Sequence, residues 1–154
     1  MTPRPIDERV VRAARGWLGT PYRHQGSRRG VGADCLGLLR GVWREVIGPE
    51  PDPVPPYTRD WAEIDPRDPL LRAAARHFPP TGAIVPGAVL VFRWSPGASA
   101  KHCGIAVGSD RMVHAYAGAG VVESALPPAW RRRIAALRRF PEPAPGSLSE
   151  PKEV

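Results

Sequence analysis

The sequence has only two cysteines among its 154 residues, Cys35 and Cys103. Two cysteines so far apart make neither a disulfide framework nor a CxxC redox motif, which excludes a disulfide-stabilised scaffold. The sequence also lacks any window of about 20 apolar residues, so no membrane span is predicted. Its first residues, MTPRPIDERVVRAARG, contain neither an apolar core nor a small-residue cleavage site. We therefore expect no secretory signal and synthesis in the cytoplasm.

Acidic residues are too few to balance the basic ones, since 15 Asp and Glu face 22 Lys and Arg and leave a net charge of +7. This excess favours a polyanionic partner: nucleic acid, an anionic cell-wall polymer or an acidic protein surface. Nucleic acid is disfavoured, because no glycine-rich phosphate loop is present and no aromatic residues interleave with the arginines. The run RRRIAALRR (131–139) is interpreted first as a solvated face, with a docking surface as the alternative.

The length and an ordinary hydrophobic share of 42% predict one domain with one core. Glycine and proline are clustered, which is typical of ordered loops between elements rather than of disorder. We expect a single domain over residues 1–140, with a proline-rich insertion at 49–82. A tail poor in apolar residues follows at 141–154.

The hydrophobic period changes from helical to strand-like along the chain. Asp7 is expected to cap the first helix, and Asp68, followed by Pro69, a short third one. The predicted elements are helices over about 7–19, 34–48 and 68–78, a strand over 87–94, a hairpin over 101–118 and a strand over 120–125. Segment 127–140 begins as a helical turn and ends as either a strand or a helix. This order predicts an α+β domain with a helix packed on a curved antiparallel sheet.

Cys35 is the candidate nucleophile, because it lies in the first turn of the second predicted helix, directly after Asp34. Unpaired backbone N–H groups and the helix dipole favour a thiolate at this position. Gly30, Gly32 and Gly37 leave room for the backbone of a substrate. A cysteine at a helix start is more often a buried hydrophobe, so Cys35 alone leaves both interpretations open.

Acyl transfer by a cysteine also needs an imidazole within reach and a third group that orients it. His102 and His114 lie on the two strands of the predicted hairpin, and a suitable register makes them diagonal neighbours on one face. Strand alternation places His102 on an open face with small neighbours and turns Cys103 into the core. A zinc site built from Cys35, Cys103 and the two histidines is disfavoured, since residues 102 and 103 point to opposite faces.

Three segments resemble the NlpC-type cell-wall cysteine peptidases over roughly residues 7–125. They are GTPYRHQGSRRGVGADCLGLLRGVW (19–43), PGAVLVFRW (86–94) and KHCGIAVGSDRMVHAYAG (101–118). The resemblance implies a papain-like fold and hydrolysis of peptide bonds in the peptidoglycan stem. The typical target of the family is the bond between γ-D-glutamate and diaminopimelate, and no cofactor is implied.

The resemblance also implies roles for individual residues. Cys35 is the nucleophile, His102 the general base and acid, and His114 the group that orients His102. Asp34 matches the position that helps to bind the free amine of the stem peptide. Tyr22 matches a tyrosine that lines the site and supports the oxyanion.

The chain departs from the family pattern at Leu36, where serine is usual, at Cys103, where valine is usual, and over the long segment 49–82. None of these departures removes a catalytic group: Leu36 and segment 49–82 bear on substrate specificity, and Cys103 is a size-conserving replacement in the core. The chain resembles stand-alone members carried on phage tails and phage-like gene transfer particles, which implies tail or baseplate partners and action at the wall of a target cell. The alternatives are a structural tail subunit without catalysis and an acyl or amide transferase on the same fold.

Overall fold

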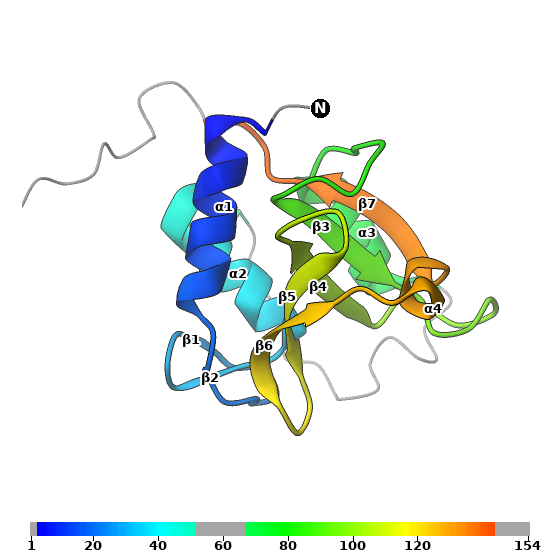
Figure 1. Ribbon diagram of the computed structural model, residues 1–154, viewed down its shortest axis with the longest axis horizontal. Helices are drawn as coiled ribbons and strands as arrows, with labels where there is room; N and C mark the ends of the chain where they lie inside the picture. Colours follow the sequence, from blue (N-terminus) through cyan, green and yellow to red (C-terminus); the bar gives the residue numbers. More distant parts are fainter. Residues whose placement is uncertain (1–2, 52–66, 144–154) are drawn as a thin grey trace, which may run out of the picture.

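The computed structural model describes residues 3–51 and 67–143, so parts of the predicted insertion and tail lie outside the described residues (Figure 1). The boundaries expected for the domain, the insertion and the tail stay predictions. None of the described helices is long and apolar enough to cross a membrane. The elements are α1 (Pro5–Gly16), β1 (Ser27–Arg28), β2 (Gly32–Ala33), α2 (Cys35–Val46), α3 (Pro69–His77), β3 (Ala88–Phe92), β4 (His102–Ala106), β5 (Arg111–Tyr116), β6 (Gly120–Ala125), α4 (Pro128–Arg131) and β7 (Ile134–Arg139).

The main sheet has five antiparallel strands in the order β6-β5-β4-β3-β7. Strand β7 pairs with β3, so the ambiguous segment 127–140 is a short helix followed by an edge strand. Helices α1 and α2 lie side by side, and α2 packs on β4 and β5 (Figure 1). The predicted α+β architecture, with a central helix on an antiparallel sheet, is confirmed.

Both faces of the sheet are covered by apolar side chains, which explains why β3 is a continuous apolar run rather than an alternating one. One face packs against α1, α2 and α3 and holds Val89, Val91, Cys103, Ile105 and Val113. The opposite face carries a second cluster, formed by Ala88, Leu90, Phe92, Ala106, Met112 and Leu126. Because side chains alternate along a strand, His102 belongs to the second face and Cys103 to the first.

Two of the expected helix caps differ from the prediction. Helix α1 begins at Pro5, because proline already has a helical φ at the first position, and Asp7 is the third residue of its first turn. The Asp7 carboxylate reaches back to the backbone N–H of Arg4 at 2.8 Å. Asp68 precedes α3 but has a positive φ of 53° and makes no side-chain cap. Its carboxylate instead accepts hydrogen bonds from Arg93 at 2.7 Å and from the Ala100 N–H at 2.9 Å, which ties α3 to the end of β3.

Candidate active site

Cys35 is the first residue of α2, as the sequence predicts, and its side chain is half-buried. Asp34 is the N-cap of this helix, and its Oδ1 accepts the N–H of Gly37 at 2.7 Å. The first N–H groups of a helix have no partner inside it, so the cysteine lies where a negative charge is stabilised.

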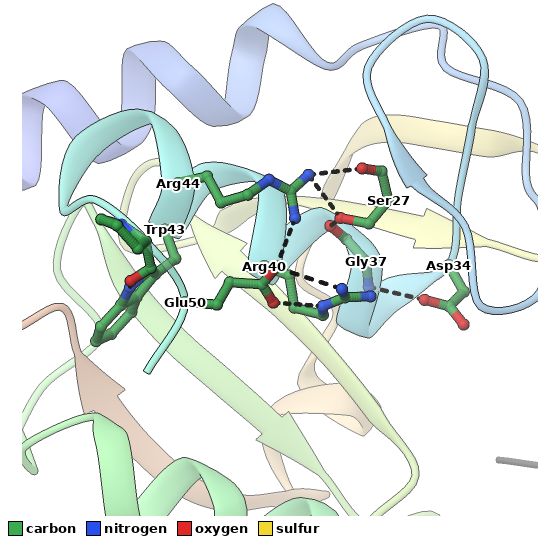
Figure 2. A network of polar contacts seen from close by, with 8 residues as sticks. Ser27, Asp34, Gly37, Arg40, Trp43, Arg44 and Glu50 are labelled. Carbon is green, nitrogen blue, oxygen red and sulfur yellow. Dashed lines mark hydrogen bonds and ion pairs between the residues drawn. The ribbon is translucent and has the colours of Figure 1, made fainter. Parts of the chain in front are cut away.

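The loop before the nucleophile is clamped to α2 by polar contacts (Figure 2). The Ser27 hydroxyl donates to the carbonyl oxygen of Gly37 at 2.7 Å. Arg44, two turns along the helix, donates to the carbonyl of Ser27 at 2.6 Å and pairs with Glu50 at 3.1 Å. Gly26 and Gly37 lie so close that a Cβ on Gly37 would be 1.7 Å from the Gly26 oxygen. These contacts hold the loop before the nucleophile against α2, and they therefore fix the position of Cys35 at the start of the helix.

His102 and His114 lie on one face of the sheet, as the hairpin pattern predicts. Strand β4 pairs with β5 through Ile105 opposite Val113, a register that makes the two histidines diagonal neighbours. His102 Nε2 is 2.8 Å from His114 Nδ1, which is a hydrogen bond. Gly104 separates them on the sheet surface, and a Cβ at that position would be only 3.1 Å from the Cβ of His114.

The face around His102 is closed, which corrects the expectation of an open face, although the expected small neighbours Gly104 and Ala106 do lie on it. His102 is only 8% exposed. Trp94 stacks on its imidazole at 5.7 Å between ring centroids, and Trp130 meets it edge-on at 5.9 Å. Trp94 follows β3 and Trp130 lies in α4, so strand alternation within the hairpin could not reveal either of them.

Cys103 is buried in the core, as predicted, and it also contacts the nucleophile. Its thiol donates to the carbonyl oxygen of Cys35 at 3.4 Å. A hydrogen bond from the Cys103 thiol is the largest cause that holds the pKa of Cys35 well below its ordinary value; burial opposes it, and hydrogen bonding to His102 and the charge of His102 lower it further. The same hydrogen bond, burial and the charge of Cys35 raise the pKa of Cys103 well above its ordinary value, so Cys103 stays a protonated donor.

The sequence interpretation treated Cys103 only as a replacement for a core valine. The signal that could have identified it is its place on β4, next to His102 and on the strand face that meets the start of α2. A side chain there has to pack against the first turn of the helix. A thiol at this place adds a hydrogen-bond donor that valine lacks.

Replacing Cys103 with valine is expected to raise the pKa of Cys35, because the Cys103 thiol, the largest cause that lowers this pKa, is lost while the volume is nearly kept. Thiolate formation, and with it alkylation of Cys35 by iodoacetamide, should then begin at a higher pH than in the wild type. The measurement is the alkylation rate of the Cys35 peptide against pH, followed by mass spectrometry. Cys103→Ser, which keeps a donor, is the matched control, and an identical pH profile for the valine variant would contradict the assignment.

His114 is 4% exposed, and burial, followed by the charge of His102, lowers its pKa to about 4. It is therefore a neutral imidazole at neutral pH. Such a ring has one donor and one acceptor nitrogen, which suits a group that orients His102. Its orienting role, like the base role of His102, stays a prediction.

Asp34 directly precedes the nucleophile, and Tyr22 pairs with Ala33, two residues before it. Asp34 is 3% exposed, and its Oδ2 accepts the N–H of Gln25 at 2.7 Å while Oδ1 caps α2. Tyr22 is half-buried, packs against the core and forms an isolated bridge with Ala33. Their contacts with substrate stay predictions, whereas the contribution of Asp34 to the start of α2 is a feature of the fold. Over residues 3–51 and 67–143, no group of three or more His, Cys, Asp or Glu could hold a metal ion.

Comparison with known proteins identifies relatives of this chain. The chain is 30% identical over 135 residues to the murein DD-endopeptidase MepS/murein LD-carboxypeptidase of Escherichia coli K12. The matched region covers 87% of this chain and 63% of that protein. It is 28% identical over 152 residues to the gamma-DL-glutamyl hydrolase of Bacillus subtilis 168, covering 98% of this chain and 32% of that protein. The chain thus spans less than two thirds of the length of either relative.

A solved structure of an NlpC/P60 family protein from Bacillus cereus ATCC 10987 shares the fold, with a TM-score of 0.63 at 20% identity over 90% of this chain and 41% of that one. This likeness confirms the predicted papain-like architecture. The model of the NlpC/P60 family matches residues 19–139, a range that contains Cys35, both histidines and every strand of the main sheet. The protein belongs to the NlpC/P60 family, as its Asp-Cys segment and histidine hairpin predicted.

Proposed function

We propose that this protein is a cysteine peptidase that hydrolyses peptide bonds in the peptidoglycan stem. The observation that carries the proposal is the arrangement of the site, with the Cys35 thiol at the first position of α2 and the His102–His114 pair, hydrogen-bonded at 2.8 Å, on neighbouring strands. The lowered pKa of Cys35, caused by the Cys103 thiol and by His102, agrees with it. The names of the two relatives, a murein endopeptidase and a gamma-DL-glutamyl hydrolase, support peptidoglycan as the substrate class.

In the proposed mechanism, the Cys35 thiolate attacks the carbonyl carbon of the scissile amide. The backbone N–H of Cys35, at the first position of α2, is placed to donate to the oxyanion. His102 then transfers a proton to the leaving amine, and a thioester between Cys35 and the acyl part remains. Water attacks this thioester while His102 accepts its proton, which releases the acid and restores the thiol.

The bond that we propose as the target joins γ-D-glutamate to diaminopimelate. The Bacillus subtilis relative is a gamma-DL-glutamyl hydrolase by name, which supports this choice. The Escherichia coli relative is named for DD-endopeptidase and LD-carboxypeptidase activity, so cross-link cleavage is the competing outcome.

The test is digestion of purified muropeptides, both uncross-linked tetrapeptides and cross-linked dimers, with products identified by mass spectrometry. Cleavage at γ-D-glutamate should release a diaminopimelate dipeptide and leave L-alanyl-D-glutamate attached to the sugar, whereas cross-link cleavage converts dimers into intact monomers. The control is the same protein alkylated with iodoacetamide at Cys35. If neither substrate yields more product than in this control, the hydrolase proposal is wrong.

The same assay distinguishes the hydrolase from the two alternatives that the sequence leaves open, a transferase and a structural tail subunit. An amine acceptor added to the digest would be incorporated into the product by a transferase, and a purely structural tail subunit would give no product. The lowered pKa of Cys35 favours a reactive thiol over a silent one. Carriage on a phage-like tail, with action at the wall of a target cell, stays a prediction from the sequence.

A further inference from the structure

The hydrogen bond between His102 and His114 continues to a third residue, Ser124. Ser124 lies on β6, in register with Met112 on β5, and so it is a diagonal neighbour of His114 on the same face of the sheet. Its hydroxyl oxygen is 3.0 Å from His114 Nε2. No motif in the sequence singles out Ser124, and the mechanism above does not use it.

The direction of these hydrogen bonds follows from the chemistry at Cys35. Nε2 of His102 is bound to His114, which leaves Nδ1 to exchange the proton with Cys35. When His102 carries this proton it is an imidazolium, and both of its nitrogens are donors. Nδ1 of His114 must therefore be an acceptor without a proton of its own.

A neutral His114 with an unprotonated Nδ1 carries its single hydrogen on Nε2. The ring is buried between Tyr116, at 5.7 Å between centroids, and Trp130, at 5.5 Å, and a buried N–H without an acceptor is costly. The Ser124 oxygen, 3.0 Å away, is such an acceptor. While His102 is an imidazolium, the other tautomer of His114 would place two N–H groups facing each other across the 2.8 Å gap between the two rings.

We propose that Ser124 is a positioning residue that holds His114 in the tautomer with hydrogen on Nε2, so that Nδ1 of His114 accepts from His102. The proposal rests on the proposed function, since it concerns the same catalytic groups. It extends the site across three neighbouring strands, with His102 on β4, His114 on β5 and Ser124 on β6.

The experiment compares Ser124→Thr with Ser124→Val, two side chains of nearly the same shape that both suit a strand. Only threonine keeps the hydroxyl. The first readout is the pair of ¹⁵N chemical shifts of the His114 ring at neutral pH in histidine-labelled protein, which report the tautomer directly. The second is kcat and KM on the muropeptide that the wild type cleaves.

We expect the threonine variant to keep hydrogen on Nε2 and a kcat close to that of the wild type. The valine variant should show a mixture of tautomers and a kcat about tenfold lower, with little change in KM. The reason is that it loses the hydrogen bond between His114 and residue 124, which matters most while His102 is an imidazolium. Thermal unfolding of both variants checks that the fold is kept. Ser124→Ala replaces the valine variant if the latter does not fold.

The proposal is overturned if the valine variant keeps hydrogen on Nε2, if its kcat is unchanged despite a shifted tautomer, or if the threonine variant loses as much activity as valine. The nitrogen shifts do not depend on substrate. If the wild type proves inactive on every muropeptide, the proposed function fails, while the tautomer comparison still decides whether Ser124 holds His114.

Discussion

Cys35→Ala is expected to lower kcat/KM on the cleaved muropeptide by at least about 10⁴-fold, because the only other thiol, Cys103, is buried in the core and stays protonated. The substitution removes one sulfur atom from a half-buried side chain at the first position of α2. Alanine is well tolerated in helices, so folding should be nearly unaffected. Circular dichroism and thermal unfolding verify this, and product release is measured by mass spectrometry.

His102→Gln provides the partner experiment for the same prediction. Glutamine keeps a polar side chain beside His114 but cannot act as a base, so we expect a loss of about 10³-fold or more. Residues that act as a unit are not additive, and the double variant should lose little beyond Cys35→Ala alone. A Cys35→Ala variant that retained more than about one hundredth of the wild-type rate would contradict the assigned nucleophile.

Gly37→Ala is expected to lower the free energy of unfolding by about 3 kcal/mol, the reverse of the usual effect of this change in a helix. The new Cβ would lie 1.7 Å from the oxygen of Gly26 and 2.8 Å from its carbonyl carbon. Both atoms belong to backbone, which cannot rotate away. The loop would have to move, which breaks the hydrogen bond from Ser27 to the Gly37 carbonyl.

The measurement is the free energy of unfolding in urea, monitored by fluorescence. Gly97→Ala is the matched control, because a Cβ at Gly97 meets nothing within 4 Å, and its effect should stay within about 0.5 kcal/mol. A folded Gly37→Ala variant should also have a slower Cys35, since the moved loop carries Asp34, the cap of α2. A Gly37→Ala protein as stable as the wild type would show that the loop is not clamped to the helix.

Much of the fold and part of the site follow from local pattern. The start of α2 after Asp34 can be predicted from residues close together in the chain, because a capping carboxylate followed by a long apolar stripe indicates a helix start. The pairing of His102 with His114 depends on a short hairpin connection, which sets the register with few alternatives. The nature of β7 was left open, because its strand form depends on pairing with β3, more than forty residues earlier in the chain.

By itself the sequence determined the family, the nucleophile segment and the two histidines on one face, since each depends on residues close together in the chain. Only the tertiary structure placed Trp94 and Trp130 over His102, the Cys103 thiol against Cys35 and Ser124 behind His114. The physical reason is that these contacts join separate elements. Whether they meet depends on sheet order and on how helix α2 packs against β4, and the period of a single segment carries no information about either.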